Sequence, residues 1–477
     1  MRTRSREGWW LRAWGGTDPV VRAMVLVLPL VKLLTVIPVK ASTYPDSRSY
    51  VRLGSWMDFS LTSLDGSSLR PWGVTAWLAL WPGEPGIVIG HALLSAVAWG
   101  ALALAVAGLV DNPVVRRGVA ASLVLIACTA QIASWDSVIL GESVSLSTGI
   151  LALAALVWLV RDPGWSRAGL FAAAALWFAM TRPNVFPVLV GWALSLVLVG
   201  ILRRRVVVWA VAAALVVFSG YSYAYNIGSD AAWTAAYGAS RTTVSLAYPI
   251  GPWNPSSRQI LADLRKSNAP RCMFGGVGQN GAVVGGGMTW VTRTVAKCPA
   301  MNTWATDNWQ RWYLNWLVTH PAATMGIIVS QVPYSLAPTI WGTVAAATPN
   351  SVAQLYLGTP DLPQDAHPTQ SYHVQPLILW LLGAVVLAIA GARRRLWRAS
   401  PWPVDLALAG SLVGSMVSVL SSALLIQTAP FEVAQESLAS ACIITAAAVS
   451  AVAVGLDRVL TPRRDARAGR RAEAHPA

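Results

Sequence analysis

The sequence predicts an all-α, polytopic integral membrane protein with about ten transmembrane helices, and three observations support this fold class. Of the 477 residues, 55% are hydrophobic and only 12% are charged, whereas a soluble domain carries roughly 25% charged residues. The mean hydropathy is +0.51. The apolar runs are about 20 residues long and rich in Ala, Leu and Val, which suits helices that cross a bilayer rather than barrel strands. An ordinary soluble enzyme and a disordered chain are both excluded.

The predicted spans follow the apolar runs along the chain. They lie near 19–39, 86–110, 118–133, 143–160, 168–181, 185–202, 206–225, 375–392, 402–425 and 437–457. A further apolar run at 322–345 contains Pro333 and Pro338, and we expect it to be re-entrant or interfacial. The first run is long and no small-residue cleavage site follows it, so we expect it to remain as an anchor rather than to be removed as a signal peptide.

The net charge of +15 is explained by topology. Arginines cluster between alternate spans, as at Arg116–Arg117, Arg203–Arg205 and Arg393–Arg395. The side with these clusters carries 21 basic and eight acidic residues, whereas the opposite side carries 13 of each. The positive-inside rule makes the arginine-rich side cytoplasmic. Both termini are then cytoplasmic, an even number of crossings is required, and a nucleic-acid partner is not needed to explain the charge.

The loops divide the chain into four parts. We expect an N-terminal transmembrane module at 1–225 with a first outer loop at 40–85, a large outer loop at 226–321, a C-terminal transmembrane module at 322–460, and a disordered, basic cytoplasmic tail at 461–477. The long connections all lie on the outer side, and functional sites are commonly built from loops. The chemistry is therefore expected outside the cytoplasm.

The first outer loop is expected to hold helices in the membrane interface. The segment Pro45-Asp46-Ser47 is a suitable helix start, and Tyr50 follows on the apolar face of that helix. A second helix is expected to begin at Arg70-Pro71-Trp72-Gly73, because proline is accepted in the first helical turn. Asp46 is equally well explained as a helix cap.

Other ionisable residues lie at the outer ends of predicted spans, namely Asp136, Glu142, Arg182 and Glu432. Taken singly, each is explained as a solvated helix end. As a set they favour a functional site, because transfer of a sugar from a lipid phosphate to a hydroxyl requires a carboxylate base and cations for the departing phosphate.

In that chemistry Asp46 is the candidate base, while Arg70 and Arg182 are candidates for binding the donor phosphate, since guanidinium groups match phosphate oxygens. Glu142 would support the base, hold a divalent cation such as Mg²⁺ or Mn²⁺, or orient the sugar. The residues alone do not choose among these roles.

These motifs together resemble the GT-C glycosyltransferases, in particular the branch that includes dolichyl-phosphate-mannose-protein mannosyltransferases and aminoarabinose transferases. The resemblance rests on the order and placement of short motifs, which are Pro45-Asp46-Ser47-x-x-Tyr50, Arg70-Pro71-Trp72-Gly73, Leu140-Gly141-Glu142-Ser143, Thr181-Arg182-Pro183-Asn184 and Asn315-Trp316-x-x-x-His320-Pro321.

The resemblance implies a reaction that inverts the anomeric carbon, a polyprenyl-phosphate sugar donor, and Asp46 as the base. The implied acceptor is a glycan, lipid or protein of the cell envelope. Tyr50, Asp136, His320 and Glu432 are the expected acceptor-binding or supporting residues. Ser47 stands where many members of the family have a second acid.

Two alternatives remain open at this point. The first is a transporter or flippase of a lipid-linked saccharide, which is favoured by Lys32 inside the first span. The second is an inactive relative that acts as a scaffold for envelope assembly, because the second acid is missing. The preference for Arg over Lys and the high Ala content indicate a bacterial protein, and hence the bacterial cytoplasmic membrane.

Two cysteines, Cys272 and Cys298, lie in the large outer loop, outside the reducing compartment. A disulfide between them is therefore the better interpretation. No Cys and His spacing indicates zinc.

Overall fold

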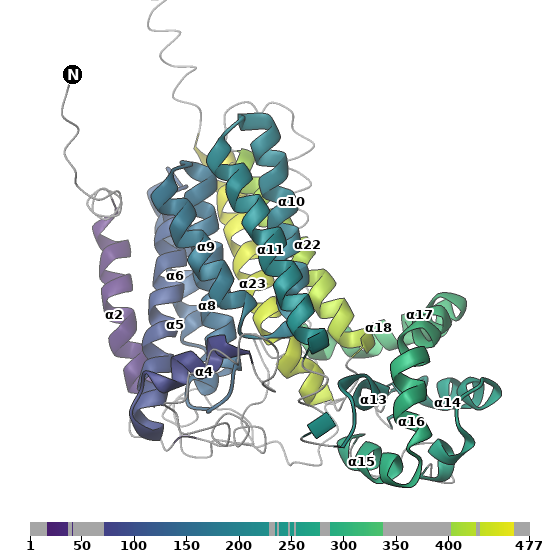
Figure 1. Cartoon of the computed structure of the whole chain (residues 1–477). Coiled ribbons are helices and arrows are strands. Elements are labelled where there is room, and N and C mark those ends of the chain that lie inside the picture. Colours follow the sequence, from purple (N-terminus) through teal and green to yellow (C-terminus); the bar gives the residue numbers. More distant parts are fainter. Residues whose placement is uncertain are drawn as a thin grey trace, which may run out of the picture.

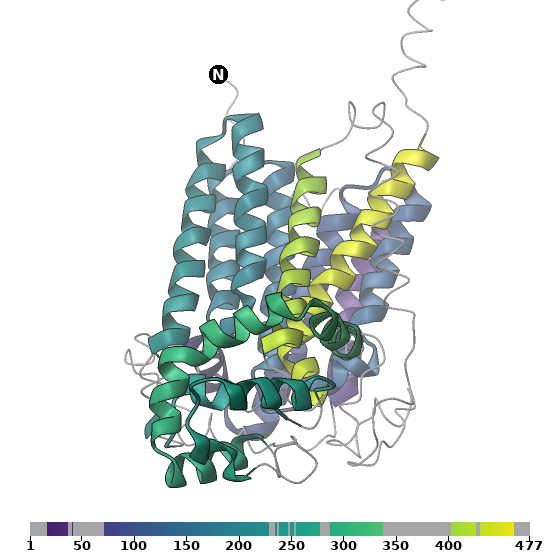
Figure 2. The ribbon, with the colours of Figure 1, turned by 90° about the vertical axis from the view of Figure 1, so that its right-hand side faces the viewer.

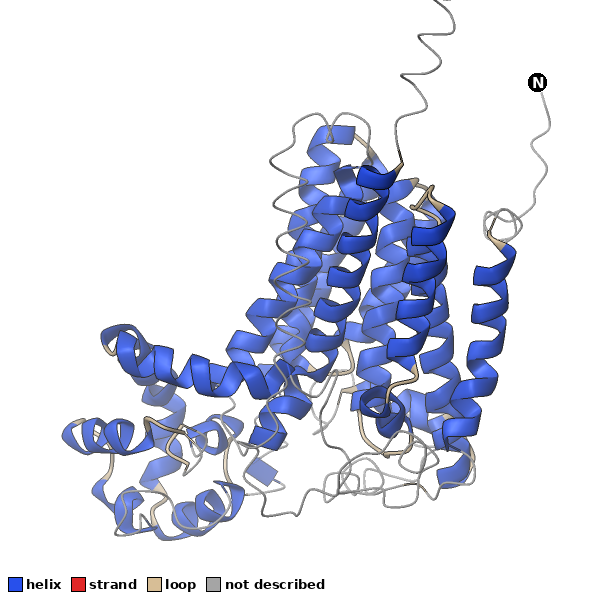
Figure 3. Cartoon of the chain, turned by 180° about the vertical axis from the view of Figure 1, so that it is seen from behind, coloured by secondary structure: helices blue, strands red, loops and turns tan. Residues whose placement is uncertain are grey.

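A computed structural model describes residues 17–36, 41, 71–228, 234–235, 238–246, 249–251, 254–276, 287–336, 402–425 and 430–461. These residues form helices, turns and loops, and no β-strand lies among them (Figure 3). Figure 1 shows a bundle of long helices with a smaller group of helices beside one end. The fold class predicted from composition is therefore confirmed for this part of the chain.

The bundle contains seven helices that are long and apolar enough to cross a membrane. They are α2 (Pro19–Val36), α5 (Gly83–Ala107), α8 (Glu142–Arg161), α10 (Phe186–Arg203), α11 (Val206–Gly228), α22 (Trp402–Leu425) and α23 (Pro430–Leu460). A multi-pass membrane protein is confirmed by these helices, whereas the count of ten spans stays a prediction.

Two of the predicted spans correspond to shorter helices of the same bundle, α6 (Pro113–Ala127) and α9 (Trp165–Ala179). Each has 15 residues, or about 22 Å of helix, which is less than the roughly 30 Å of a bilayer core. Asn112 fixes the start of α6, because its side chain accepts hydrogen bonds from the main-chain nitrogens of Val114 and Val115. The predicted span at 375–392 lies outside the described residues.

Short elements connect the outer ends of these helices. The helix expected near Arg70 is α4 (Trp72–Ala79), which follows Pro71. The connection between α6 and α8 contains α7 (Ala130–Asp136), and α9 leads into α10 through the short helix η2 (Pro183–Val185).

The segment predicted to be the large outer loop contains a group of short helices that we call the outer domain. Its helices are α13 (Arg241–Leu246), α14 (Ser257–Lys266), η3 (Arg271–Gly276), α15 (Gly287–Lys297), α16 (Ala300–Trp304), η4 (Ala305–Trp309) and α17 (Gln310–Thr319). This domain has its own hydrophobic cluster, separate from the core of the bundle, and it includes Ile260, Met273, Trp309 and Tyr313. The chain then returns to the bundle through α18 (Pro321–Leu336), which packs against α22 and α23.

The two transmembrane modules meet along a seam of small residues between α10 and α22. Gly410 and Gly414 form a Gly-x-x-x-Gly pair on α22, and a Cβ atom at Gly191 of α10 would lie only 2.4 Å from the carbonyl oxygen of Gly410. The hydroxyl of Ser195 donates to the carbonyl of Leu406 at 2.9 Å. Close approach of backbones through small residues is the usual way in which helices associate in lipid, where water provides no hydrophobic driving force.

The arginine-rich helix ends meet at one end of the bundle. There Arg117 of α6 pairs with Asp18 before α2 at 3.0 Å, and Arg458 of α23 pairs with Asp405 of α22 at 2.6 Å. The outer domain lies toward the opposite end (Figure 1). The arginine-rich connections between helices therefore lie at one end of the bundle, and the outer domain lies toward the other end.

The orientation of these ends can be tested by labelling. Lys266 in the outer domain has a side chain that is 77% exposed, and Asp162, between α8 and α9, has one that is 69% exposed. If the arginine-rich end is cytoplasmic, Lys266→Cys should react with a membrane-impermeant maleimide in intact cells, whereas Asp162→Cys should react only after permeabilisation. Labelling in the reverse order would invert the topology.

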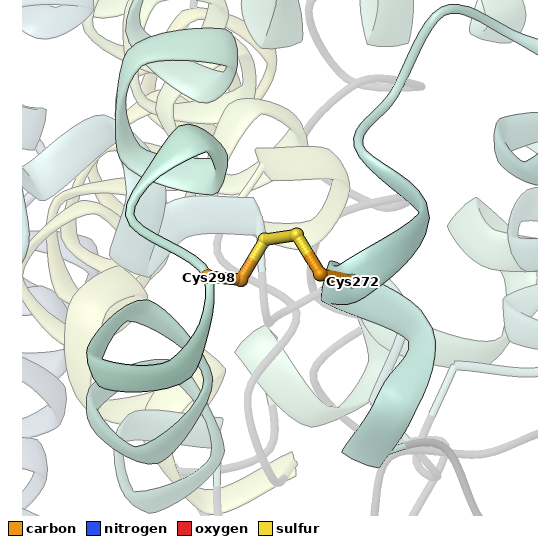
Figure 4. Close-up of a disulfide and its surroundings, with 2 residues drawn as sticks. All are labelled: Cys272 and Cys298. Atoms are coloured by element: carbon orange, nitrogen blue, oxygen red, sulfur yellow. A yellow bond between two sulfur atoms is a disulfide. The ribbon is translucent and has the colours of Figure 1, made fainter.

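A disulfide between Cys272 and Cys298 joins η3 to the end of α15, and the Cα atoms lie 5.6 Å apart (Figure 4). The two cysteines are 26 residues apart in sequence. A cross-link of this length restricts the unfolded chain more than the folded one.

Removing this cross-link should destabilise the outer domain. Loop closure over 26 residues corresponds to about 3–4 kcal/mol. We expect Cys272→Ser together with Cys298→Ser to unfold at clearly lower temperature, measured by tryptophan fluorescence of purified protein. Cys128→Ser, at a cysteine without a disulfide, is the control. Equal melting of the double variant and the parent would contradict the expectation.

Candidate functional site

Two acidic residues lie buried where α7 ends and α8 begins. Asp136 is the last residue of α7 and Glu142 the first of α8, and each is at most 3% exposed. Ionised carboxylates are buried in proteins only with partners that offset the loss of hydration. The partners of these two acids come from different parts of the sequence.

Asp136 pairs with Lys32, which lies four residues before the end of the first span, α2. The Lys32 ammonium nitrogen lies 2.6 Å from Oδ2 of Asp136 and donates a 2.8 Å hydrogen bond to the carbonyl of Ala127 at the end of α6. The hydroxyl of Ser143 donates to the other oxygen of Asp136 at 2.7 Å. Lys32 is fully buried, so this one side chain ties α2 to α6, α7 and, through Ser143, α8.

The imidazole of His91 lies next to this pair. His91 is fully buried in α5, near the main chain of Asp136. Neither ring nitrogen makes a hydrogen bond to the described residues, so the imidazole packs beside the pair without bonding to it.

Glu142 pairs with Arg182, which stands in the turn between α9 and η2. The side chain of Arg182 is 11% exposed and that of Glu142 is 3% exposed. The hydroxyl of Thr181 donates to that of Ser145 one turn further along α8, at 3.0 Å. The segments around Glu142 and Arg182, which are 40 residues apart in sequence, therefore form one local structure.

The start of α4 is docked against the same turn. The main-chain nitrogen of Gly73 donates to the carbonyl of Met180 at 2.9 Å, and the indole nitrogen of Trp177 donates to the carbonyl of Gly73 at 2.9 Å. A Cβ atom at position 73 would lie 2.6 Å from the Met180 oxygen, so glycine is required there. Gly73, the last residue of the Arg-Pro-Trp-Gly motif, is thus bonded to Met180, which lies two residues before Arg182 in the sequence.

Lys32, Asp136, Glu142 and Arg182 together carry two positive and two negative charges. Because each acid has a basic partner, the cluster is neutral as it stands. No three His, Cys, Asp or Glu side chains come close enough to hold a metal ion in the described part of the chain. The divalent cation considered for Glu142 stays a prediction, and no step of the proposed reaction uses one.

Three of the predicted site residues, Asp46, Tyr50 and Arg70, lie outside the described residues. Glu432 lies on the first turn of α23, and its side chain is not described. The described part of the site therefore consists of Asp136, Glu142 and Arg182, which the structure brings together.

His320 lies in the outer domain rather than in this cluster. Its ring stacks on Trp316 with centroids 4.7 Å apart, and its Nε2 atom is 3.4 Å from Oδ2 of Asp263. Hydrogen bonds from Lys266 and Trp316 hold the pKa of Asp263 below its usual value. His320 is part of the junction between α14, α17 and α18.

The sequence interpretation missed the partner of Lys32. It used this lysine as an argument for a transporter, although an ionisable residue within a span usually has a partner of opposite charge. Asp136, at the end of another predicted span, was the available acid. Recognising their contact required the packing of α2 against α7, which no local pattern reports.

The Lys32–Asp136 pair should be a strong determinant of stability. Lys32→Met leaves Asp136 buried without its cation, and we expect a loss of about 3–5 kcal/mol. Combining it with Asp136→Leu removes both charges and should recover much of the loss. Unfolding of purified protein in mixed detergent micelles measures both effects.

Leu34→Met is the control, because Leu34 lies on the same helix and is 58% exposed. If Lys32→Met and Leu34→Met unfold alike, the pair is not structural.

Comparison with models of known protein families gives no match to this chain. A search of curated proteins likewise gives no significant relative. The resemblance to GT-C glycosyltransferases therefore stays a prediction based on short motifs, and the function has to be argued from the residues of the site.

Proposed function

We propose that this protein is a membrane glycosyltransferase of the GT-C type that acts at the outer face of a bacterial cytoplasmic membrane, with both termini in the cytoplasm. It moves a sugar from a polyprenyl-phosphate donor to a glycan, lipid or protein of the cell envelope. The observation that carries this proposal is the meeting of Glu142, Arg182 and the start of α4 at the outer end of the bundle. A donor with a lipid tail and a polar head would be handled at this level of the membrane.

Arg182 is the group that we assign to the donor phosphate. Its guanidinium is largely buried and faces a carboxylate. A phosphate is tetrahedral rather than planar, but like a carboxylate it is negatively charged and offers two oxygens that a guanidinium can bind side by side. Phosphate binding then exchanges one anionic partner for another, and Arg70 supplies a second cation. The exchange releases Glu142, which can orient the sugar hydroxyls or support the base.

In the proposed reaction Asp46 takes the proton of the acceptor hydroxyl. The hydroxyl oxygen forms a bond to the anomeric carbon while the bond from that carbon to the phosphate oxygen breaks, and the configuration inverts. The polyprenyl phosphate leaves as an anion, which Arg70 and Arg182 stabilise. Tyr50 and Glu432 are assigned to the acceptor side and Asp136 to a supporting role, whereas His320, which lies in the outer domain, has no part in the proposed reaction.

A transporter was favoured by the presence of a lysine inside the first span, and that lysine now has another explanation. Lys32 is fully engaged with Asp136 and the carbonyl of Ala127, so it is accounted for as a structural cation. An inactive scaffold would retain the same packing but would not transfer sugar, and an activity assay separates it from an enzyme.

The proposal is tested with membranes that receive a radiolabelled polyprenyl-phosphate sugar. Asp46→Asn should abolish transfer without lowering expression, because the base is removed. Arg182→Lys keeps the charge but loses the bidentate geometry, so we expect a raised KM for the donor. Glu142→Gln should lower kcat.

The matched control is Asp405→Asn, which breaks an ion pair at the arginine-rich end of the bundle. It should leave transfer unchanged. Full activity of Asp46→Asn would refute the assigned base, and the absence of any transfer by the parent from a panel of donors would favour the scaffold.

A further inference from the structure

The chain makes a sharp turn at His320 and Pro321, between α17 and α18. We call residues 310–332 the elbow. It projects sideways from the bundle, level with the outer part of the long helices, while α15 and α16 lie lower in the view of Figure 1; Figure 2 shows the same region from the side. The elbow is therefore beside the membrane-spanning helices rather than above them.

The elbow presents large apolar side chains on its exposed surface. Leu314 and Val318 of α17 are 55% and 79% exposed, and Met325 and Val329 of α18 are 54% and 67% exposed. Both pairs are four residues apart, so each pair lies on one face of its helix. The sequence from 312 to 336 contains no Lys, Arg, Asp or Glu.

The opposite side of the elbow packs against the outer domain and the bundle. Tyr313 and Trp316 are buried in the outer domain, and the Tyr313 hydroxyl donates to the carbonyl of Leu424 near the end of α22 at 2.9 Å. Ile327 is fully buried on the opposite side of α18 from Val329. The apolar face is thus kept turned outward, and it is not covered by any described residue.

We infer that this apolar face of the elbow inserts into the outer leaflet of the bilayer. Helices with an apolar face can lie in the membrane interface, and α18, which carries Met325 and Val329, packs against the spans α22 and α23. Leu314, Val318, Met325 and Val329 contact the acyl chains just below the head groups.

The charge of the outer domain favours lipid over a second copy of the chain. Between residues 238 and 336 there are eight basic and only two acidic residues. Two such domains would repel each other, whereas anionic head groups would attract both the domain and Arg311, one turn from Leu314. The basic residues would reinforce an insertion that the apolar residues begin.

The test uses the full-length protein in liposomes and an environment-sensitive fluorophore on single cysteines. Val318→Cys and Met325→Cys are made in a chain in which Cys128 and Cys442 are replaced by alanine, so that only the new thiol reacts. Lys266→Cys, on α14 of the same domain, is the control. Lipids brominated near the head-group end of the acyl chains serve as the quencher.

We expect blue-shifted emission and quenching by the brominated lipids at positions 318 and 325, and neither effect at 266. Quenching no greater than at 266 would overturn the inference. So would labels at 318 and 325 that are shielded from aqueous iodide yet insensitive to brominated lipid, because a protein would then cover the face. The assay needs no enzymatic activity, so its outcome is independent of the proposed function.

Discussion

A lysine can be fully buried in this bundle only because an aspartate meets it there. Hydrocarbon does not solvate an ammonium group, so Lys32 must be neutralised within the protein, and Asp136 lies 2.6 Å from it. The contact fixes α2 against the junction of α6 and α7. Through Ser143 it also fixes the residue next to Glu142, so the geometry of the candidate site depends on this charge pair.

The same requirement shapes the site itself. Glu142 and Arg182 are buried as a pair, and the cluster that they form with Lys32 and Asp136 carries no net charge. The neutral cluster is stable without a ligand. To bind an anion, Arg182 must exchange the carboxylate of Glu142 for that anion. This explains how a largely buried arginine can be both a structural residue and a receptor for phosphate in the proposed reaction.

The acidic and basic residues on the predicted outer side are equal in number only when all of its segments are counted together. The outer domain is basic, and the first outer loop at 40–85 carries four acidic and four basic residues. The compensating acids are Asp136, Glu142, Asp230, Asp361, Asp365, Glu432 and Glu436. The outer domain is therefore positive, whereas the other outer segments taken together are negative. In the arrangement that we propose, the positive domain attaches to the membrane surface and the reaction takes place at the candidate site.

Composition and the length of the apolar runs were sufficient to predict a helical membrane protein, because a bilayer permits few other solutions for an unsolvated backbone. Alternating arginines likewise predicted the two ends of the bundle, and Asp136, Glu142 and Arg182 were recognised as boundary charges. Their partners could not be predicted. Whether Lys32 met Asp136, or Arg182 met Glu142, depended on how helices distant in sequence pack, and side-chain patterns along one helix carry no information about that. Local sequence determined which charged residues had to be neutralised, and only the tertiary packing decided which residues neutralise them.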